Sequence, residues 1–238
     1  MLELKNICFS ADGKQILNNI NLVIDDAKFI VITGPNGSGK STLAKIIAGI
    51  EQPDSGQILL DGQDITQWGI TERAKAGISF AFQQPVRFKG VTVKDLVTLA
   101  SGQDLSTAAA CEYLSEVGLC AKDYIDREVN SSLSGGELKR IEIATVMARK
   151  TKLTLFDEPE AGIDLWSFKN LIDVFEKMHK EIHGSILIIS HQERILNIAD
   201  QVVVINAGQV AQVGTKDEVL PGLFGVDTGC RYMQGGNE

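Results

Sequence analysis

Nine residues, FDEPEAGID at positions 156–164, contain four carboxylates directly after the apolar stretch 153–156. An ionised carboxylate is costly to bury unless its charge is compensated, and a bound divalent cation compensates it well. The stretch therefore predicts a metal site at the end of a buried strand. Asp157 is the expected ligand, which leaves Glu158 free for another task.

A glycine-rich segment upstream, GPNGSGKS at positions 34–41, predicts what brings that metal. An apolar strand precedes it and an amphipathic helix follows, the context in which such a loop binds phosphate. Its glycines let successive backbone N–H groups surround a phosphate, and the helix N-terminus adds partial positive charge. The expected nucleotide-binding residues are Gly34, Pro35, Asn36, Gly37, Ser38, Gly39, Lys40, Ser41 and Thr42.

The two segments together predict ATP and Mg²⁺ as ligands. We expect Lys40 to reach the β and γ phosphates and Ser41 to place its hydroxyl on Mg²⁺. Asp157 would hold the ion from the opposite side, directly or through water, because Mg²⁺ prefers oxygen ligands and keeps several waters. Glu158 would then polarise the attacking water as general base. A solvated strand end would also explain the two acids, but the phosphate loop favours catalysis.

A second anion site is predicted within SLSGGELKR, positions 132–140. Ser134 is a good N-cap residue for a helix that begins near Glu137. Gly135 and Gly136 would expose backbone N–H groups at the positive end of that helix. The segment therefore predicts a second place where a phosphate can bind.

The elements that must position these residues follow an α/β pattern. Apolar runs of strand length alternate with amphipathic helical stretches, which is typical of a largely parallel sheet. The beginning differs, because Asp12 and Gly13 form a hairpin signal and predict an antiparallel β portion. From Val93 to about Val129 the patterns are helical and predict a small insertion. Further helices are expected at 137–150 and 165–183, and an irregular tail from residue 222.

Composition excludes several classes of protein. A chain of 238 residues, 44% of them hydrophobic, can bury a full core. Its net charge of −8 argues against a nucleic-acid surface. Its four cysteines lie far apart and suggest reduced thiols. Because the first ten residues carry charges and no apolar run approaches the ~18 residues of a membrane span, a cytoplasmic protein is expected.

The pentapeptide LSGGE at 133–137 is specific enough to suggest a family. Placed shortly before the acidic strand end, it resembles the signature of ABC ATPases, and the resemblance covers nearly the whole chain. It implies a P-loop NTPase fold with a RecA-like core and antiparallel β subdomain, residues 1–83 and 134–238, and a helical subdomain, residues 84–133. Since the chain has one copy of each motif, the resemblance also implies a head-to-tail dimer that hydrolyses ATP to ADP and phosphate.

Other positions match that family residue by residue. Gln83 resembles the Q-loop glutamine that senses Mg²⁺ and the attacking water, and His191 resembles the switch histidine that contacts the γ phosphate. The segment 161–164 resembles the D-loop, with Asp164 reaching toward the partner. The aromatic residue that many members stack on adenine, expected near Ala11, is missing, and Glu160 has no assignment.

The finer resemblance is to SufC, the soluble ATPase of iron–sulfur cluster assembly. It rests on AFQQP followed by GV at 90–91, on SGGELKR at 134–140 and on SHQERIL at 190–196. It implies that ATP-driven dimerisation pulls on a scaffold of the SufB or SufD type, which would hold the cluster because this chain lacks clustered thiolates. The alternative is the ATP-binding subunit of an ABC membrane transporter, which touches the membrane only through its partner. A non-catalytic ABC-like scaffold is a third hypothesis.

Overall fold

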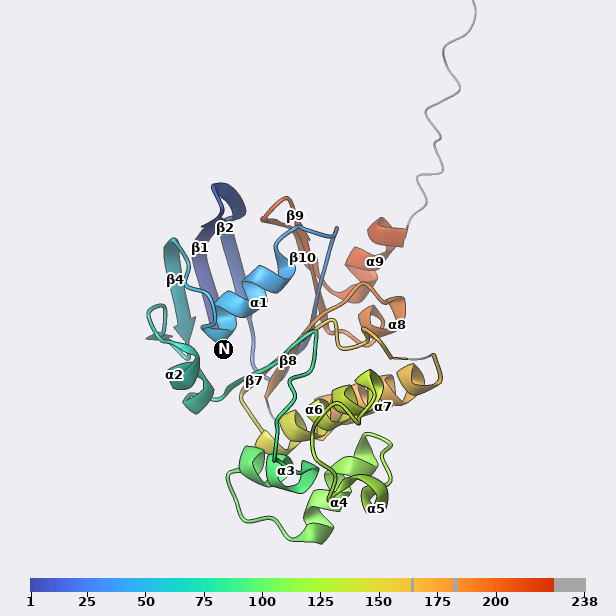
Figure 1. Ribbon diagram of the computed structural model, residues 1–238. Coiled ribbons are helices and arrows are strands. Elements are labelled where there is room, and N and C mark those ends of the chain that lie inside the picture. Colours follow the sequence, from blue (N-terminus) through green and yellow to red (C-terminus); the bar gives the residue numbers. More distant parts are fainter. Residues whose placement is uncertain (164, 182–183, 225–238) are drawn as a thin grey trace, which may run out of the picture.

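The computed structural model describes residues 1–163, 165–181 and 184–224, arranged as in Figure 1. The strands are β1 (Leu2–Ala11), β2 (Lys14–Ile24), β3 (Phe29–Thr33), β4 (Ser55–Leu60), β5 (Gln63–Asp64), β6 (Ile78–Ala81), β7 (Leu153–Asp157), β8 (Ser185–Ile189), β9 (Gln201–Asn206) and β10 (Gln209–Gly214). The helices are α1 (Lys40–Ala48), α2 (Ile70–Lys75), α3 (Val93–Ser101), α4 (Thr107–Glu116), α5 (Ala121–Tyr124), α6 (Gly135–Arg149), α7 (Leu165–Glu181), α8 (Glu193–Leu196) and α9 (Lys216–Phe224).

Two sheets form the β framework. The smaller is antiparallel, in the order β2-β1-β4-β5. The larger has the order β10-β9-β3-β8-β7-β6 and is parallel except for the pair β9–β10. Asp12 and Gly13 both adopt positive φ, 51° and 73°, in the turn between β1 and β2. This confirms the expected hairpin and the antiparallel β portion.

The core is divided by the larger sheet. In β3, Phe29 and Val31 join one cluster of buried apolar side chains, while Ile30 and Ile32 join the other, as the period of two in a strand requires. The second cluster fills the space between the two sheets, where α1 lies in Figure 1. The first extends under the helices on the other face and includes residues of α3, α4, α6 and α7. The larger sheet is therefore covered on both faces.

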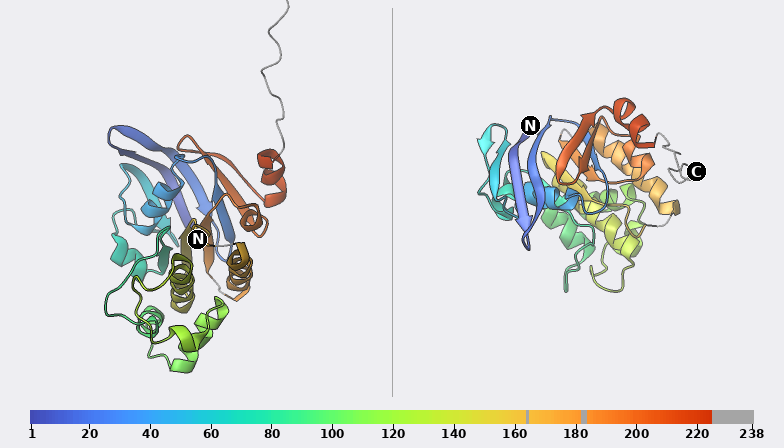
Figure 2. Two further views of the ribbon diagram at one scale, coloured as in Figure 1. Left: turned by 45° about the vertical axis from the view of Figure 1, so that its right-hand side comes forward. Right: turned by 90° about the horizontal axis from the view of Figure 1, so that it is seen from above.

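Helices α3, α4 and α5 gather at one end of the molecule in both Figure 1 and Figure 2. They occupy the stretch between β6 and α6 where the sequence predicts an insertion. Val97 of α3 and Leu114 of α4 are fully buried in the same cluster as Phe156 of β7. The helical stretch thus has no separate core of its own among the described residues, and it packs directly onto α6.

Several bounds differ from the sequence expectation. α6 begins at Gly135, two residues earlier than expected, because Ser134 caps it. Residues 222–224 were expected to begin an irregular tail but complete α9; residues 225–238 lie outside the described ranges. The short elements β10, α2, α8 and α9 were not expected, since each is too short or too weakly patterned to show a clear period.

Arg73 of α2 is fully buried and holds the end of α1. Its guanidinium donates to the carbonyl oxygens of Ile46 and Ile47 at the end of that helix, and to those of Thr66 and Trp68. Burial lowers the pKa of Arg73 to about 10. A cation at a helix C-terminus also opposes the negative end of the helix dipole. Arg73 therefore fixes the helix that follows the phosphate loop.

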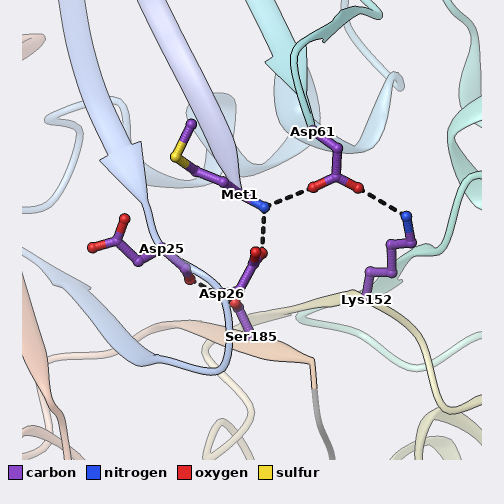
Figure 3. A network of polar contacts seen from close by, with 6 residues as sticks. All are labelled: Met1, Asp25, Asp26, Asp61, Lys152 and Ser185. Atoms are coloured by element: carbon purple, nitrogen blue, oxygen red, sulfur yellow. Dashed lines mark hydrogen bonds and ion pairs between the residues drawn. The ribbon is translucent and has the colours of Figure 1, made fainter.

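Figure 3 shows a network of polar contacts near the amino ends of β7 and β8. Asp61, after β4, accepts from the Met1 amino group and from Lys152 Nζ, both at 2.8 Å. Nearby, Ser185 Oγ donates to the Asp25 carbonyl oxygen at 2.7 Å. Because Lys152 and Ser185 precede or begin β7 and β8, the network joins the two sheets at the amino ends of these strands. The carboxyl ends are left for the site described next.

Candidate active site

The phosphate loop connects β3 to α1 and leaves no room for side chains at two of its glycines. Gly34 has φ 136°, and a Cβ there would lie 2.0 Å from the Ile205 carbonyl oxygen of β9. Gly39 has φ 100°, and a Cβ there would lie 2.6 Å from a side-chain carbon of Leu17. Both positions require glycine. The loop thus packs closely against β9 and β2. This packing fixes the position at which the loop can hold a phosphate.

The polar groups of the loop fit a phosphate. Lys40 is buried, and its Nζ donates to the carbonyl oxygens of Gly34 and Pro35, each at 2.9 Å. Burial lowers the pKa of Lys40, although the carboxylates of Glu158 and Asp157 oppose this shift. An anion would compensate this buried cation better than two carbonyls do.

Ser38 gives a second observation of the same kind. Its hydroxyl is buried and has no hydrogen-bond partner within the described ranges. A buried unpaired hydroxyl is costly, and a bound phosphate oxygen would satisfy it. The loop backbone around it is fixed, since Gly208 N–H donates to the Ser38 carbonyl at 3.2 Å. Pro35, Asn36 and Gly37 form the exposed tip of the loop.

Two oxygen donors meet at the carboxyl end of β7. Ser41 Oγ donates to Asp157 Oδ1 at 2.9 Å. Asp157 is only 4% exposed, and burial, together with the nearby Glu158, raises its pKa even though Ser41 stabilises the charged form. No cluster of three or more His, Cys, Asp or Glu side chains suited to a metal occurs in the part of the chain that is described. The donors fit Mg²⁺, which binds through few protein oxygens together with substrate phosphates.

Glu158 and Gln83 face each other across β7 and β6. Gln83 Nε2 donates to Glu158 Oε2 at 2.6 Å, and Gln83 is exposed. Glu158 has φ 44°, an uncommon conformation for a residue with a Cβ, and its N–H donates to the Ile189 carbonyl of β8. The strain at this turn aims the carboxylate away from the direction it would take in a continued strand. The expected acid and the expected glutamine are thus brought together.

Glu160, which the sequence left without a role, supports the segment after β8. It accepts a hydrogen bond from Ser190 Oγ at 2.5 Å, and Ser190 Oγ in turn accepts from Gln192 N–H at 3.0 Å. Burial raises the pKa of Glu160, while Ser190 and the neighbouring His191 oppose this. His191 itself is exposed. The serine directly before His191 was the signal that could have suggested this contact; Asp164 lies outside the described residues.

Ser134, Gly135 and Gly136 form the capped start of α6. Ser134 and Glu137 make a capping box in which each side chain accepts from the other's backbone N–H. Tyr124 Oη donates to Glu137, and this bond and the Ser134 N–H hold the pKa of Glu137 down at about 2. Within the described ranges no hydrogen bond or ion pair joins these three residues to the phosphate loop. The second predicted anion site therefore makes no polar contact with the first within the described part of the chain.

Comparisons with known proteins give the family. The ABC transporter family model matches residues 17–161. The chain is 37% identical to an uncharacterized ABC transporter ATP-binding protein of Methanocaldococcus jannaschii, over 92% of this chain and 90% of the relative. It is 35% identical to the spermidine/putrescine import ATP-binding protein PotA of Mesoplasma florum, over 92% of this chain but only 63% of the relative's length.

The fold agrees with a solved structure. A dimeric ATP-binding cassette bound to ADP and Pi superposes with a TM-score of 0.80 at 23% identity, covering 91% of this chain and 99% of that one. At this identity the likeness shows the α/β cassette fold. With the family model and the relatives, it leads to one conclusion: the chain belongs to the ABC transporter family of ATPases.

Proposed function

We propose that this chain is the ATP-binding subunit of an ABC transporter, and that two copies close on two Mg-ATP molecules to hydrolyse them. The observation that carries the proposal is the gathering of Lys40, Ser41, Asp157, Glu158 and Gln83 at the carboxyl ends of β3, β7 and β6. Ligands of α/β proteins bind at these ends. Such a set matches the needs of phosphoryl transfer, which depends on positioning and on charge neutralisation.

Each residue would have a defined task. With ATP bound, the Lys40 amino group would donate to the β and γ phosphates instead of to its two loop carbonyl oxygens. The Ser38 hydroxyl would gain a phosphate oxygen as its hydrogen-bond partner. Ser41 and Asp157, with Gln83 nearby, would hold Mg²⁺, which neutralises phosphate charge when bound. Glu158 would take the proton of the attacking water, and Gln83 would orient that water. His191 would contact the γ phosphate.

The site in one chain is incomplete on this view. Ser134 and Gly135 are exposed at the capped start of α6, and no hydrogen bond or ion pair among the described residues joins them to their own phosphate loop. In a head-to-tail pair each copy could offer this end to the ATP held by the other, and a helix N-terminus favours such an anion. The likeness to a dimeric cassette bound to ADP and Pi supports the pairing of two copies.

We propose that the cavity between the core and α3 is the docking surface for a transmembrane partner. It is a cavity of about 180 Å³ lined by apolar side chains that include Phe82, Val86, Phe88 and Leu96. Val86 is 47% exposed and Phe88 39%, which is unusual for side chains of this size. We propose that residues 84–133 act as a subdomain whose junction with the core receives an apolar segment of the partner. No helix in the described ranges is long and apolar enough to cross a membrane.

A SufC-like role in iron–sulfur cluster assembly is the second candidate. It rests only on the resemblance of the segments 134–140 and 190–196, and neither the family model nor the relatives reported above point to it. In this role the partner would be a soluble scaffold of the SufB or SufD type. The named relative PotA, an import protein, favours the transporter.

Purification of the tagged chain from its native cells tests the choice. A transporter subunit is expected to bring a membrane permease with it in detergent. Val86→Glu should abolish this capture, because it places a charge in the groove; Leu99→Glu, which changes a side chain already 78% exposed, is the matched control. Capture of a soluble scaffold without detergent would overturn the transporter in favour of the second candidate. A chain that binds ATP but never releases phosphate would overturn both.

A further inference from the structure

Two side chains of α6 bind the backbone of one residue at the end of β6. Glu142 Oε1 accepts from Phe82 N–H at 3.0 Å. Lys139 Nζ donates to the Phe82 carbonyl oxygen and to Glu142 Oε2, the latter at 3.0 Å. Phe82 is thus held at both of its backbone hydrogen-bonding groups by an ion pair, where a continued strand would have used a neighbouring strand.

The ion pair is buried. The Lys139 side chain is 1% exposed and that of Glu142 is 16% exposed. Removing two charges from water is energetically costly, and well-packed apolar residues often give equal or greater stability. Burial raises the pKa of Glu142, and only the contacts with Lys139 and Phe82 oppose this. Stability alone therefore does not explain the pair. Its contacts with the Phe82 backbone say more about its role.

Phe82 occupies a junction between three parts of the site. It directly precedes Gln83, whose amide lies 2.6 Å from Glu158. The helix that holds it, α6, is capped by the signature residue Ser134. Phe82 and Glu142 also line the apolar cavity proposed for the partner. A shift of α6 or of this cavity wall would move the Phe82 backbone and Gln83 with it.

We propose that Lys139 and Glu142 are positioning residues for ATP hydrolysis: by clamping the Phe82 backbone they keep Gln83 against Glu158, so that the partner cavity and the hydrolytic site respond to each other. This inference rests on the proposed ATPase function. The residues touch neither nucleotide nor water; they act through Gln83. No further reactive step is involved, because the pair transfers no proton and binds no ligand.

The effect of Lys139→Met on kcat, measured in the wild-type chain and in the Gln83→Ala chain, tests the proposal. Lys139→Met should lower kcat by about 10- to 100-fold, the effect expected of a misplaced catalytic group. The dissociation constant for ATP should stay within about twofold, because the phosphate loop is untouched. In a Gln83→Ala background the same change should have no further effect. An equal fractional loss of kcat in both backgrounds would overturn the proposal, since a merely structural role gives independent effects.

Two further variants keep the test valid. The double change Lys139→Met with Glu142→Leu replaces the pair by apolar side chains, so it should fold even if the single variant does not, and it should still have a low kcat. Lys152→Met is the matched control: it also removes a lysine from an ion pair, with Asp61, but at the other end of β7. It should leave kcat unchanged. Wild-type turnover in the double variant would contradict the clamp.

Hydrogen exchange separates this inference from the proposed function. The Phe82 amide should exchange at least tenfold faster in the double variant than in the wild type or in Lys152→Met. If the wild-type chain hydrolyses no ATP, the proposed function fails, while the exchange rate still decides whether the pair holds this backbone. Unchanged exchange at Phe82 would overturn the clamp even in an active enzyme.

Discussion

The two carboxylates at the end of β7, Asp157 and Glu158, have different surroundings although they are adjacent in the chain. Asp157 is buried against Ser41, whereas Glu158 turns at φ 44° toward the exposed amide of Gln83. The first environment suits a ligand that must stay in place, and the second suits a base that must reach water. The difference comes from the strained turn after β7, which sends the second side chain in a new direction.

Glu158→Gln should separate binding from hydrolysis. The amide keeps the size of the side chain but cannot accept a proton, so phosphate release should fall by about 10²- to 10⁴-fold. ATP binding should persist, because Lys40 and Ser41 are unchanged. Phosphate release and equilibrium binding measure the two effects. Glu112→Gln, an exposed acid on α4, is the control, and an equal loss of phosphate release in that variant would contradict the assignment.

Asp157→Asn should stabilise the nucleotide-free protein while it abolishes Mg²⁺-dependent hydrolysis. Burial raises the pKa of Asp157 above its usual 3.8, so the folded state binds this proton more tightly than the unfolded state. The stability that the folded state gains from this tighter proton binding is full below pH 3.8 and is lost as the pH rises through the raised pKa. The neutral amide avoids that loss, so the melting temperature of the variant should exceed that of the wild type at pH 7 and approach it near pH 4. A lower melting temperature at pH 7 would contradict this account.

Residues of the site differ in how well the sequence predicts them. The phosphate loop, Asp157 and Glu158 follow from short motifs, because their chemistry requires fixed residue types within a few positions. Lys139, Glu142 and Glu160 do not, since their partners Phe82 and Ser190 lie 30 to 60 residues away. Such contacts depend on how the strands are ordered in the sheet, which the local pattern does not specify.

Helices α3 and α6 begin with the same kind of capping box, but we expect them to have different functions. Ser134 caps α6 and Thr92 caps α3, each in a capping box with an acid three residues later. Replacing either by alanine should cost about 1 kcal/mol of stability. Chemical denaturation measures this cost.

The variants Ser134→Ala and Thr92→Ala also test the role of the segment LSGGE at 133–137. Ser134→Ala should also lose most ATP-dependent phosphate release, because its hydroxyl and the exposed helix end would face the partner's ATP. Thr92→Ala should retain phosphate release, since α3 lies away from the phosphate loop. Comparable phosphate release in both variants, at comparable stability, would mean that Ser134 acts only as a helix cap.

The Arg73 guanidinium joins α2 to the end of α1. Arg73→Met should cost about 3 kcal/mol or more, since it leaves several buried carbonyl oxygens without donors. Arg149→Ala is the control, because Arg149 donates to the Ala74 carbonyl at an exposed position and its loss should cost under about 1 kcal/mol. Urea unfolding compares the two variants. Equal losses would show that burial of Arg73 is not what makes it important.

Elements with a strong period or a continuous apolar run were predictable, whereas the short helices α2 and α8 were not. The alternation in β1 and β2 and the helical repeats of α3 and α4 each extend over nine or more residues. α2 and α8 have six and four residues, and α8 forms beside a packed core that buries Ile195 and Leu196. The tertiary environment, which local pattern does not encode, therefore determines these short helices.

At the level of the whole molecule, we propose two anion-binding ends, the phosphate loop and the start of α6. Lys40 closes the loop on itself, and within the described residues no hydrogen bond or ion pair joins the loop to Ser134, Gly135 or Gly136. A low rate in the free chain and a higher rate in the closed pair follow from this separation. The Lys139–Glu142 pair adds a path by which a partner in the apolar cavity could influence that closure, since it joins the cavity wall to Gln83.

We infer that each copy supplies the part of the site that the other lacks. A crystal structure of the Glu158→Gln variant with Mg-ATP tests it most directly. We expect two nucleotides at the dimer interface, with Ser134 of each copy within hydrogen-bond distance of the terminal phosphate bound by the other. A nucleotide-bound dimer in which Ser134 faces solvent, or a monomer with ATP fully enclosed by one chain, would contradict the account.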